Sequence, residues 1–99
     1  MKNIIVLMLL WIGSIDGLFG QKLTGRVTDV ADYSTIVGVN VTIEGLRRGT
    51  VTDQNGIYRF DNLPEGEYEV HFSFVGMESV IKKVKIAGGA PVSLNVSMH

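Results

Sequence analysis

The chain has 99 residues, a formal net charge of −1 and no cysteine. This length accommodates at most one ordinary domain, and without thiols the chain cannot form disulfide bridges, zinc–thiolate centres or lipid attachments at cysteine. After residue 20, eight Lys and Arg residues stand against nine Asp and Glu residues, so no basic face is implied and nucleic acid is not an expected partner.

The first 20 residues have the pattern of a cleaved secretory signal peptide. Lys2 gives a short positive segment, and the unbroken apolar run of residues 4–12 follows it. A membrane anchor is the alternative, but spanning a bilayer takes about 20 apolar residues, and Asp16 interrupts the run. We therefore expect a signal peptide over residues 1–20 and an exported domain over residues 21–99.

After the leader, apolar and polar residues alternate with a period of two, which is typical of half-buried β-strands. Val, Ile, Thr and aromatic residues dominate these runs, as pleated sheets favour, and no window shows a helical stripe. The alternating runs, in chain order, are residues 23–28, 39–44, 57–60, 67–74, 80–86 and 92–98.

Turn-forming residues separate these runs. Residues 45–49 link two strands, residues 53–56 form a tight turn ending in Asn-Gly, and residues 62–66 form a second turn around a proline. A Gly- and Pro-containing segment, residues 87–91, precedes the last run. Six or seven short strands joined in this way predict an all-β fold, a small Ig-like β-sandwich in which two sheets bury one face each in a shared core.

One turn matches the beginning of a calcium-binding loop. Asp53 and Asn55 stand at the alternate spacing of its first oxygen ligands and Gly56 follows them, but Pro64 occupies the place where that loop needs a bidentate Glu. The pattern therefore predicts a hairpin turn capped by Asp53 and no calcium site.

Lysines give the chain its only basic cluster. Lys82, Lys83 and Lys85 fall within one alternating run. Lysines on the outermost strand of a sheet discourage pairing with other chains, so we expect this run to be a solvated edge strand.

The remaining polar residues predict no catalytic, cofactor-binding or metal-binding residue. His71 lies on an outward strand position with Glu67 and Glu69 on the same face, and no second His is near it in sequence. The sequence contains no Gly-x-Ser-x-Gly elbow, and Glu65, Glu67 and Glu69 fall on an exposed hairpin rather than in a cleft. We therefore predict that the domain is not an enzyme and needs no cofactor.

Several segments, taken in one order, resemble a known family. A G-x-V-x-D pattern lies in residues 23–29, a Gly-Thr-Val-Thr-Asp run opens residues 49–58, and a Val-Gly-Met step lies in residues 74–77; residues 36–41 and 63–68 add to the likeness. This order resembles the carboxypeptidase-regulatory-like domain, a transthyretin-like β-sandwich, over nearly the whole chain after the leader.

The resemblance implies a location and a role. In Bacteroidetes-type bacteria, similar domains follow a signal peptide at the mature N-terminus of TonB-dependent outer-membrane transporters. The implied role is that of a non-catalytic periplasmic accessory or interaction domain, ahead of a plug and a β-barrel that imports glycans or other nutrients. Its implied partners are proteins of the outer-membrane uptake machinery, with membrane association only through the larger transporter and a location in the periplasm or outer membrane.

The sequence also departs from the transporter pattern. Residues 30–35 replace a shorter Gly-x-Pro-like turn, Met77 replaces the usual Tyr, and the chain stops where a TonB-binding segment and plug are expected. We interpret it as a truncated or N-terminal piece of a transporter, with a free-standing exported binding module for carbohydrate or a cell-surface protein as the alternative. Tyr33 is the candidate aromatic for sugar binding, although a loop anchor packed on the sandwich is the simpler expectation for it.

Overall fold

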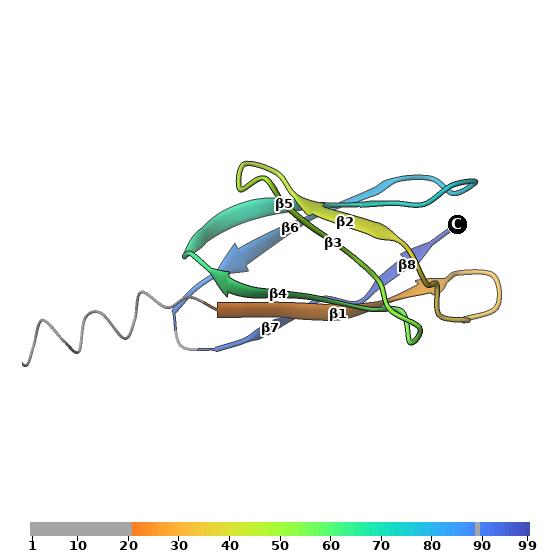
Figure 1. The fold of residues 1–99 in the computed structure, drawn as a ribbon, viewed down its shortest axis with the longest axis horizontal. Coiled ribbons are helices and arrows are strands. Elements are labelled where there is room, and N and C mark those ends of the chain that lie inside the picture. Colours follow the sequence, from red (N-terminus) through yellow and green to blue (C-terminus); the bar gives the residue numbers. More distant parts are fainter. Residues whose placement is uncertain (1–20, 89) are drawn as a thin grey trace, which may run out of the picture.

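The computed structural model describes residues 21–88 and 90–99, and the predicted signal peptide over residues 1–20 lies outside them. All regular structure in these ranges is β, arranged in two facing layers (Figure 1). The strands are β1 (Gln21–Asp29), β2 (Asn40–Ile43), β3 (Arg48–Val51), β4 (Ile57–Leu63), β5 (Gly66–Ser73), β6 (Val80–Ile86), β7 (Val92–Ser93) and β8 (Val96–Met98). The predicted all-β sandwich is confirmed.

The two sheets differ in how their strands run. The first has the order β4-β1-β7, with β8 also pairing with β1; β4 is antiparallel to β1, whereas β7 and β8 are parallel to it. The second has the order β3-β2-β5-β6 and is antiparallel throughout. Because β1 is the central strand of the first sheet, its outward side chains occupy the middle of that sheet's outer face.

The described residues form eight strands where six or seven were expected, because β3 lies outside the six alternating runs and the last run is divided into β7 and β8. Between β7 and β8, the Leu94 amide donates to the Thr24 carbonyl, and the side-chain oxygen of Asn95 accepts a hydrogen bond of 2.9 Å from the Arg26 amide. A side chain thus takes the place of a backbone acceptor, and the ladder along β1 is interrupted there.

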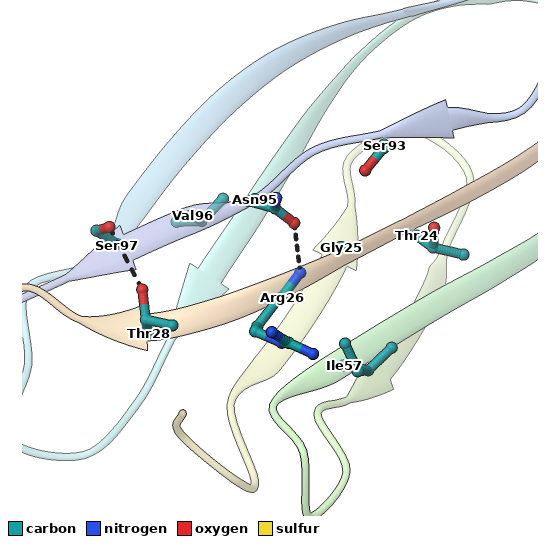
Figure 2. Close-up of a pocket in the computed structure, with 9 residues that line it drawn as sticks. All are labelled: Thr24, Gly25, Arg26, Thr28, Ile57, Ser93, Asn95, Val96 and Ser97. Atoms are coloured by element: carbon teal, nitrogen blue, oxygen red, sulfur yellow. Dashed lines mark hydrogen bonds between the residues drawn. The ribbon is translucent and has the colours of Figure 1, made fainter. Parts of the chain in front are cut away.

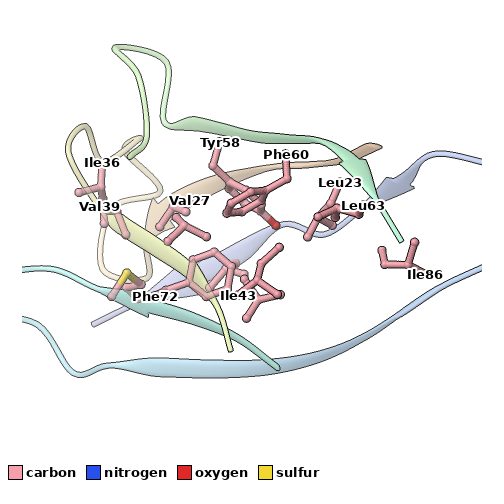
Figure 3. Close-up of a cluster of buried hydrophobic side chains, with 14 residues drawn as sticks. Leu23, Val27, Ile36, Val39, Ile43, Tyr58, Phe60, Leu63, Phe72 and Ile86 are labelled. Atoms are coloured by element: carbon pink, nitrogen blue, oxygen red, sulfur yellow. The ribbon is translucent and has the colours of Figure 1, made fainter. Parts of the chain in front are cut away.

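The core lies between the sheets and follows the predicted alternation (Figure 3). The aromatic rings of Tyr58 and Phe72 come from opposite sheets and meet edge to face, with centroids 5.3 Å apart, an arrangement that aromatic pairs prefer. The buried apolar residues are Leu23, Val27, Ile36, Val39, Val41, Ile43, Tyr58, Phe60, Leu63, Val70, Phe72, Ile86, Val96 and Met98.

Gly25 marks the tightest approach inside the first sheet. The hydroxyl of Tyr58, a residue only 1% exposed, donates to the Leu94 carbonyl directly over this glycine. A Cβ at Gly25 would overlap the Leu94 oxygen and stand 2.6 Å from the Tyr58 hydroxyl. Only a glycine leaves room for this approach, and the contact fixes where the chain passes from β7 to β8.

β6 is an edge strand, as the lysine cluster predicted, since it pairs only with β5. Lys82 stands opposite buried Val70, which places its Cβ on the core-facing side of the edge. Lys83 and Lys85 stand opposite glutamates of β5 on the outer side. A charge on the inner side of an edge strand opposes pairing with another chain, so this edge is protected.

Candidate functional site

The Asp53 turn is built for structure rather than for calcium. The Asp53 carboxylate accepts hydrogen bonds from the amides of Asn55 (2.8 Å) and Ile57 (3.0 Å), and Gly56 adopts a φ of 73°. Because one carboxylate oxygen already holds two backbone amides, the residue caps the turn that leads into β4. The predicted turn and its Asp53 cap are confirmed, but the prediction of a hairpin is wrong, because the turn joins β3 of one sheet to β4 of the other.

His71 has a single carboxylate beside it. Its Nε2 lies 3.4 Å from the Glu69 carboxylate, and its side chain is 35% exposed, so it is more covered than the solvent-facing position expected. Across residues 21–88 and 90–99, no three His, Cys, Asp or Glu side chains gather closely enough to hold a metal ion. No helix in the same ranges is long and apolar enough to cross a membrane.

Tyr33 is not the loop anchor that the sequence suggested. Its side chain is 82% exposed and its φ is 63°, in the left-handed region. The turn around it is held by a bond from the Tyr33 amide to the Asp29 carbonyl and by the Asp32 carboxylate, which accepts from the amide and hydroxyl of Ser34. The two hydrogen bonds from Ser34 lower the pKa of the Asp32 carboxyl, and the bond from the Ser34 hydroxyl has the larger effect. The closed turn presents the phenol ring to solvent instead of folding it against the sheets.

Other apolar side chains are exposed at the same end of the sandwich. The loops 30–39 and 74–79 lie there together with the C-terminus (Figure 1). The Val30 amide donates to the Met98 carbonyl, and Gly38 lies beside the Phe74 ring, and these contacts hold both loops at this end of the sandwich. We call it the apolar loop end, and it consists of Val30 (49% exposed), Tyr33, Val37 (55%) and Val75 (91%).

A second surface is a polar groove on the outer face of the first sheet (Figure 2). It opens over the break between β7 and β8 and has a volume of about 490 Å³. Hydroxyls dominate its rim: those of Thr28 and Ser97 lie 3.5 Å apart. The lining residues are Thr24, Gly25, Arg26, Thr28, Ile57, Ser93, Asn95, Val96 and Ser97.

Sequence reasoning missed this groove. The alternation of Thr24, Arg26 and Thr28 marked them as outward-facing, but only the strand order shows that Ser93 and Ser97 stand beside them. The sequence named no catalytic, cofactor-binding or metal-binding residue, and that stays a prediction.

The fold and its two surfaces define a small β-sandwich domain that offers loops at one end and a polar sheet face for contact. The family model of the CarboxypepD_reg-like domain matches residues 23–99. The chain therefore belongs to the CarboxypepD_reg-like domain family, as the sequence resemblance indicated.

Individual relatives agree with this membership. The whole chain is 27% identical to part of TonB-dependent receptor P3 from Formosa agariphila, of which it spans 9%. Among solved structures, the Bacillus anthracis TIE protein matches 80% of the chain with a TM-score of 0.69 at 20% identity, over 16% of its own length. A 5-hydroxyisourate hydrolase from Klebsiella pneumoniae matches 80% of the chain with a TM-score of 0.57 at 18% identity, over 89% of its length. These structures share the fold.

Proposed function

We propose that this chain is the exported accessory domain of a TonB-dependent outer-membrane uptake system for glycans, non-catalytic and acting by contact with protein partners. The observation that carries the proposal is the match of the whole chain to a TonB-dependent receptor that is about ten times longer. In this proposal residues 1–20 are the signal peptide, residues 21–99 form the domain, and the domain works at the periplasmic side of the outer membrane.

The apolar loop end supplies the contact surface. A left-handed backbone conformation destabilises a non-glycine residue by about 1–2 kcal/mol. Packing of the Tyr33 side chain does not offset this free-energy cost, because its ring is exposed to solvent. Strain of this kind persists where a residue serves another purpose. Tyr33 gives a partner protein an aromatic side chain to bury, a residue type enriched among the anchors of protein interfaces, and Val75 adds an exposed aliphatic side chain at the same end of the sandwich.

A chromosomal deletion tests the proposal. The coding region for residues 21–99 is removed in frame, the leader is kept, and growth is compared on single polysaccharides and on glucose. We expect slower growth on at least one polysaccharide and unchanged growth on glucose. Unchanged growth across a broad polysaccharide panel contradicts the proposal.

A free-standing exported binding module, for carbohydrate or a cell-surface protein, is the second candidate. The exposed Tyr33 favours it, since an aromatic ring held in solvent by a closed turn suits either ligand. Binding of a glycan array or of intact cells by the purified protein, lost in Tyr33→Ala and kept in Tyr68→Phe, supports this function. Absence of binding to both removes it.

A further inference from the structure

The outer face of the first sheet is cationic, although the chain as a whole is slightly acidic. Thr24 pairs with Arg59 and Arg26 pairs with Ile57, so the two arginines are diagonal neighbours on adjacent strands. Diagonal neighbours across an antiparallel pair lie about 7–8 Å apart, within reach of each other's long side chains. Lys22 extends the same face at the beginning of β1, and both arginines are exposed. Asp61, two residues after Arg59 on β4, is exposed on this face too, so the face carries three cations and one carboxylate.

Asp61 is the carboxylate nearest in register to these cations, but it forms no ion pair with them within the described chain. The ion pairs found there join His71 to Glu69 and His99 to Glu78, and neither includes an arginine. The second sheet differs, because its outward lysines stand opposite glutamates across β5 and β6. The first sheet thus presents two guanidinium groups whose charge is available to a ligand.

The groove beside Arg26 supplies neutral hydrogen-bonding groups. Thr24 and Ser93 are paired across β1 and β7, which brings their hydroxyls to one rim of the groove (Figure 2). Asn95 commits its side-chain oxygen to the Arg26 amide, so its NH₂ group is the part that remains as a donor. None of the lining residues is acidic, and nothing in the groove would repel an anion.

We propose that this face is a binding site for an acidic polysaccharide. Guanidinium groups bind carboxylates and sulfates through two parallel hydrogen bonds, and the hydroxyl and amide groups of the groove match the hydroxyls of a sugar chain. Single-stranded nucleic acid needs aromatic platforms for its bases, and the aromatic residues of β4, Tyr58 and Phe60, point into the core instead.

This site lies on a different surface from Tyr33. It goes beyond the proposed glycan function by naming a negatively charged class of polysaccharide as the ligand. Its test depends neither on the transporter nor on the apolar loop end. A failure of the proposed uptake role therefore leaves the site to be judged by its own experiment.

Matched dextrans provide the probes. The chain is expressed with its leader and purified from the periplasm, and its binding to dextran, carboxymethyl-dextran and dextran sulfate is measured calorimetrically at equal ionic strength. We expect at least one of the two charged polymers to bind, and neutral dextran to bind at least 10-fold more weakly. The charged polymer that binds more tightly identifies the acidic group as carboxylate or sulfate.

Variants then locate the site. The double variant R26Q/R59Q should lower the affinity for the charged polymer at least 10-fold, and T24V/S93A, which removes two hydroxyls, should lower it about 3- to 10-fold. The double variant K83Q/K85Q removes the same charge from the other sheet and should change the affinity less than 2-fold, as should Tyr33→Ala. Thermal unfolding of each variant confirms that the fold is kept.

Four results would overturn the inference. The first is that neither charged dextran binds, and the second is that R26Q/R59Q and K83Q/K85Q lose equal affinity for the charged polymer. The third is an unchanged affinity in T24V/S93A. The fourth is equal or tighter binding of poly-glutamate, which would mean an acidic peptide site. Binding lost in Tyr33→Ala but kept in R26Q/R59Q would place carbohydrate at the loop end and not at this face.

Discussion

Replacing Gly25 with alanine should destabilise the domain more than the same replacement at any other glycine in a strand. The new Cβ would overlap the Leu94 carbonyl oxygen and crowd the Tyr58 hydroxyl, which donates to that oxygen. Inserting a methyl into a packed core costs about 1–3 kcal/mol, and weakening a hydrogen bond of a buried phenol adds about 1 kcal/mol. The expected loss in the free energy of unfolding is therefore about 2–4 kcal/mol.

Urea unfolding followed by far-ultraviolet circular dichroism measures this loss, since the only tryptophan, Trp11, lies in the predicted leader. For a domain of this size each kcal/mol corresponds to about 4–8 °C in Tm, so thermal scans should show a drop of roughly 10–25 °C. Gly49→Ala is the matched control: a Cβ there meets a Thr42 methyl at 3.3 Å on an edge strand, and should change stability by less than about 1 kcal/mol.

A double-mutant cycle separates the two contacts. In a Tyr58→Phe background the hydroxyl is gone, so Gly25→Ala should cost about 1 kcal/mol less than in the parent. If Gly25→Ala changes the free energy of unfolding by no more than Gly49→Ala does, the reasoning about this close approach is refuted.

Three further predictions concern single residues. Thr52→Val should lower the free energy of unfolding by about 2–4 kcal/mol, because the buried Thr52 hydroxyl donates to the Ile36 carbonyl (2.6 Å) and accepts from the Val39 amide (2.9 Å); urea unfolding should show Thr52→Ser closer to the parent, and equal losses would contradict this. Burial raises the pKa of Tyr58 above its usual value. Its contribution to the free energy of unfolding is therefore fully present below about pH 10 and falls by up to about 1.4 kcal/mol per pH unit above it. When the free energy of unfolding is measured between pH 8 and 11, the Tyr58→Phe variant should lack this part of the decrease. Tyr33→Gly should raise the free energy of unfolding by about 0.5–1 kcal/mol, since it relieves a left-handed backbone at the cost of an exposed ring; a decrease in Tm would show that the ring packs in solution.

The strands could be predicted from the sequence because burial in a sandwich follows a period of two. Val27, Phe60 and Phe72 are each flanked by polar residues, and each lies in the core. The Asp53 turn was equally predictable, since its hydrogen bonds are local and join residues at most four positions apart. Both features depend on short stretches of chain that carry their own signal.

The remaining features depend on contacts between distant segments. The break at Leu94 and Asn95 depends on residues of two other strands. Gly25 of β1 and Tyr58 of β4 leave room there for the Leu94 carbonyl. The position of Tyr33 depends on a turn without Gly or Pro, for which the sequence pattern gave no rule.

The cationic face was hidden for the same reason. Net charge near zero implied no basic face, yet Arg26 and Arg59, 33 positions apart in sequence, become neighbours when β4 pairs with β1. Strand order, which alternation does not specify, is what brings together the residues of both surfaces.

The size and location of the native product test whether this domain works within a TonB-dependent uptake system. An antibody raised against residues 21–99 is used to blot periplasmic and outer-membrane fractions of the native organism. We expect a band many times larger than this chain in the outer membrane. A band of about the size of this chain in the soluble periplasm would contradict this expectation and favour a free-standing binding module.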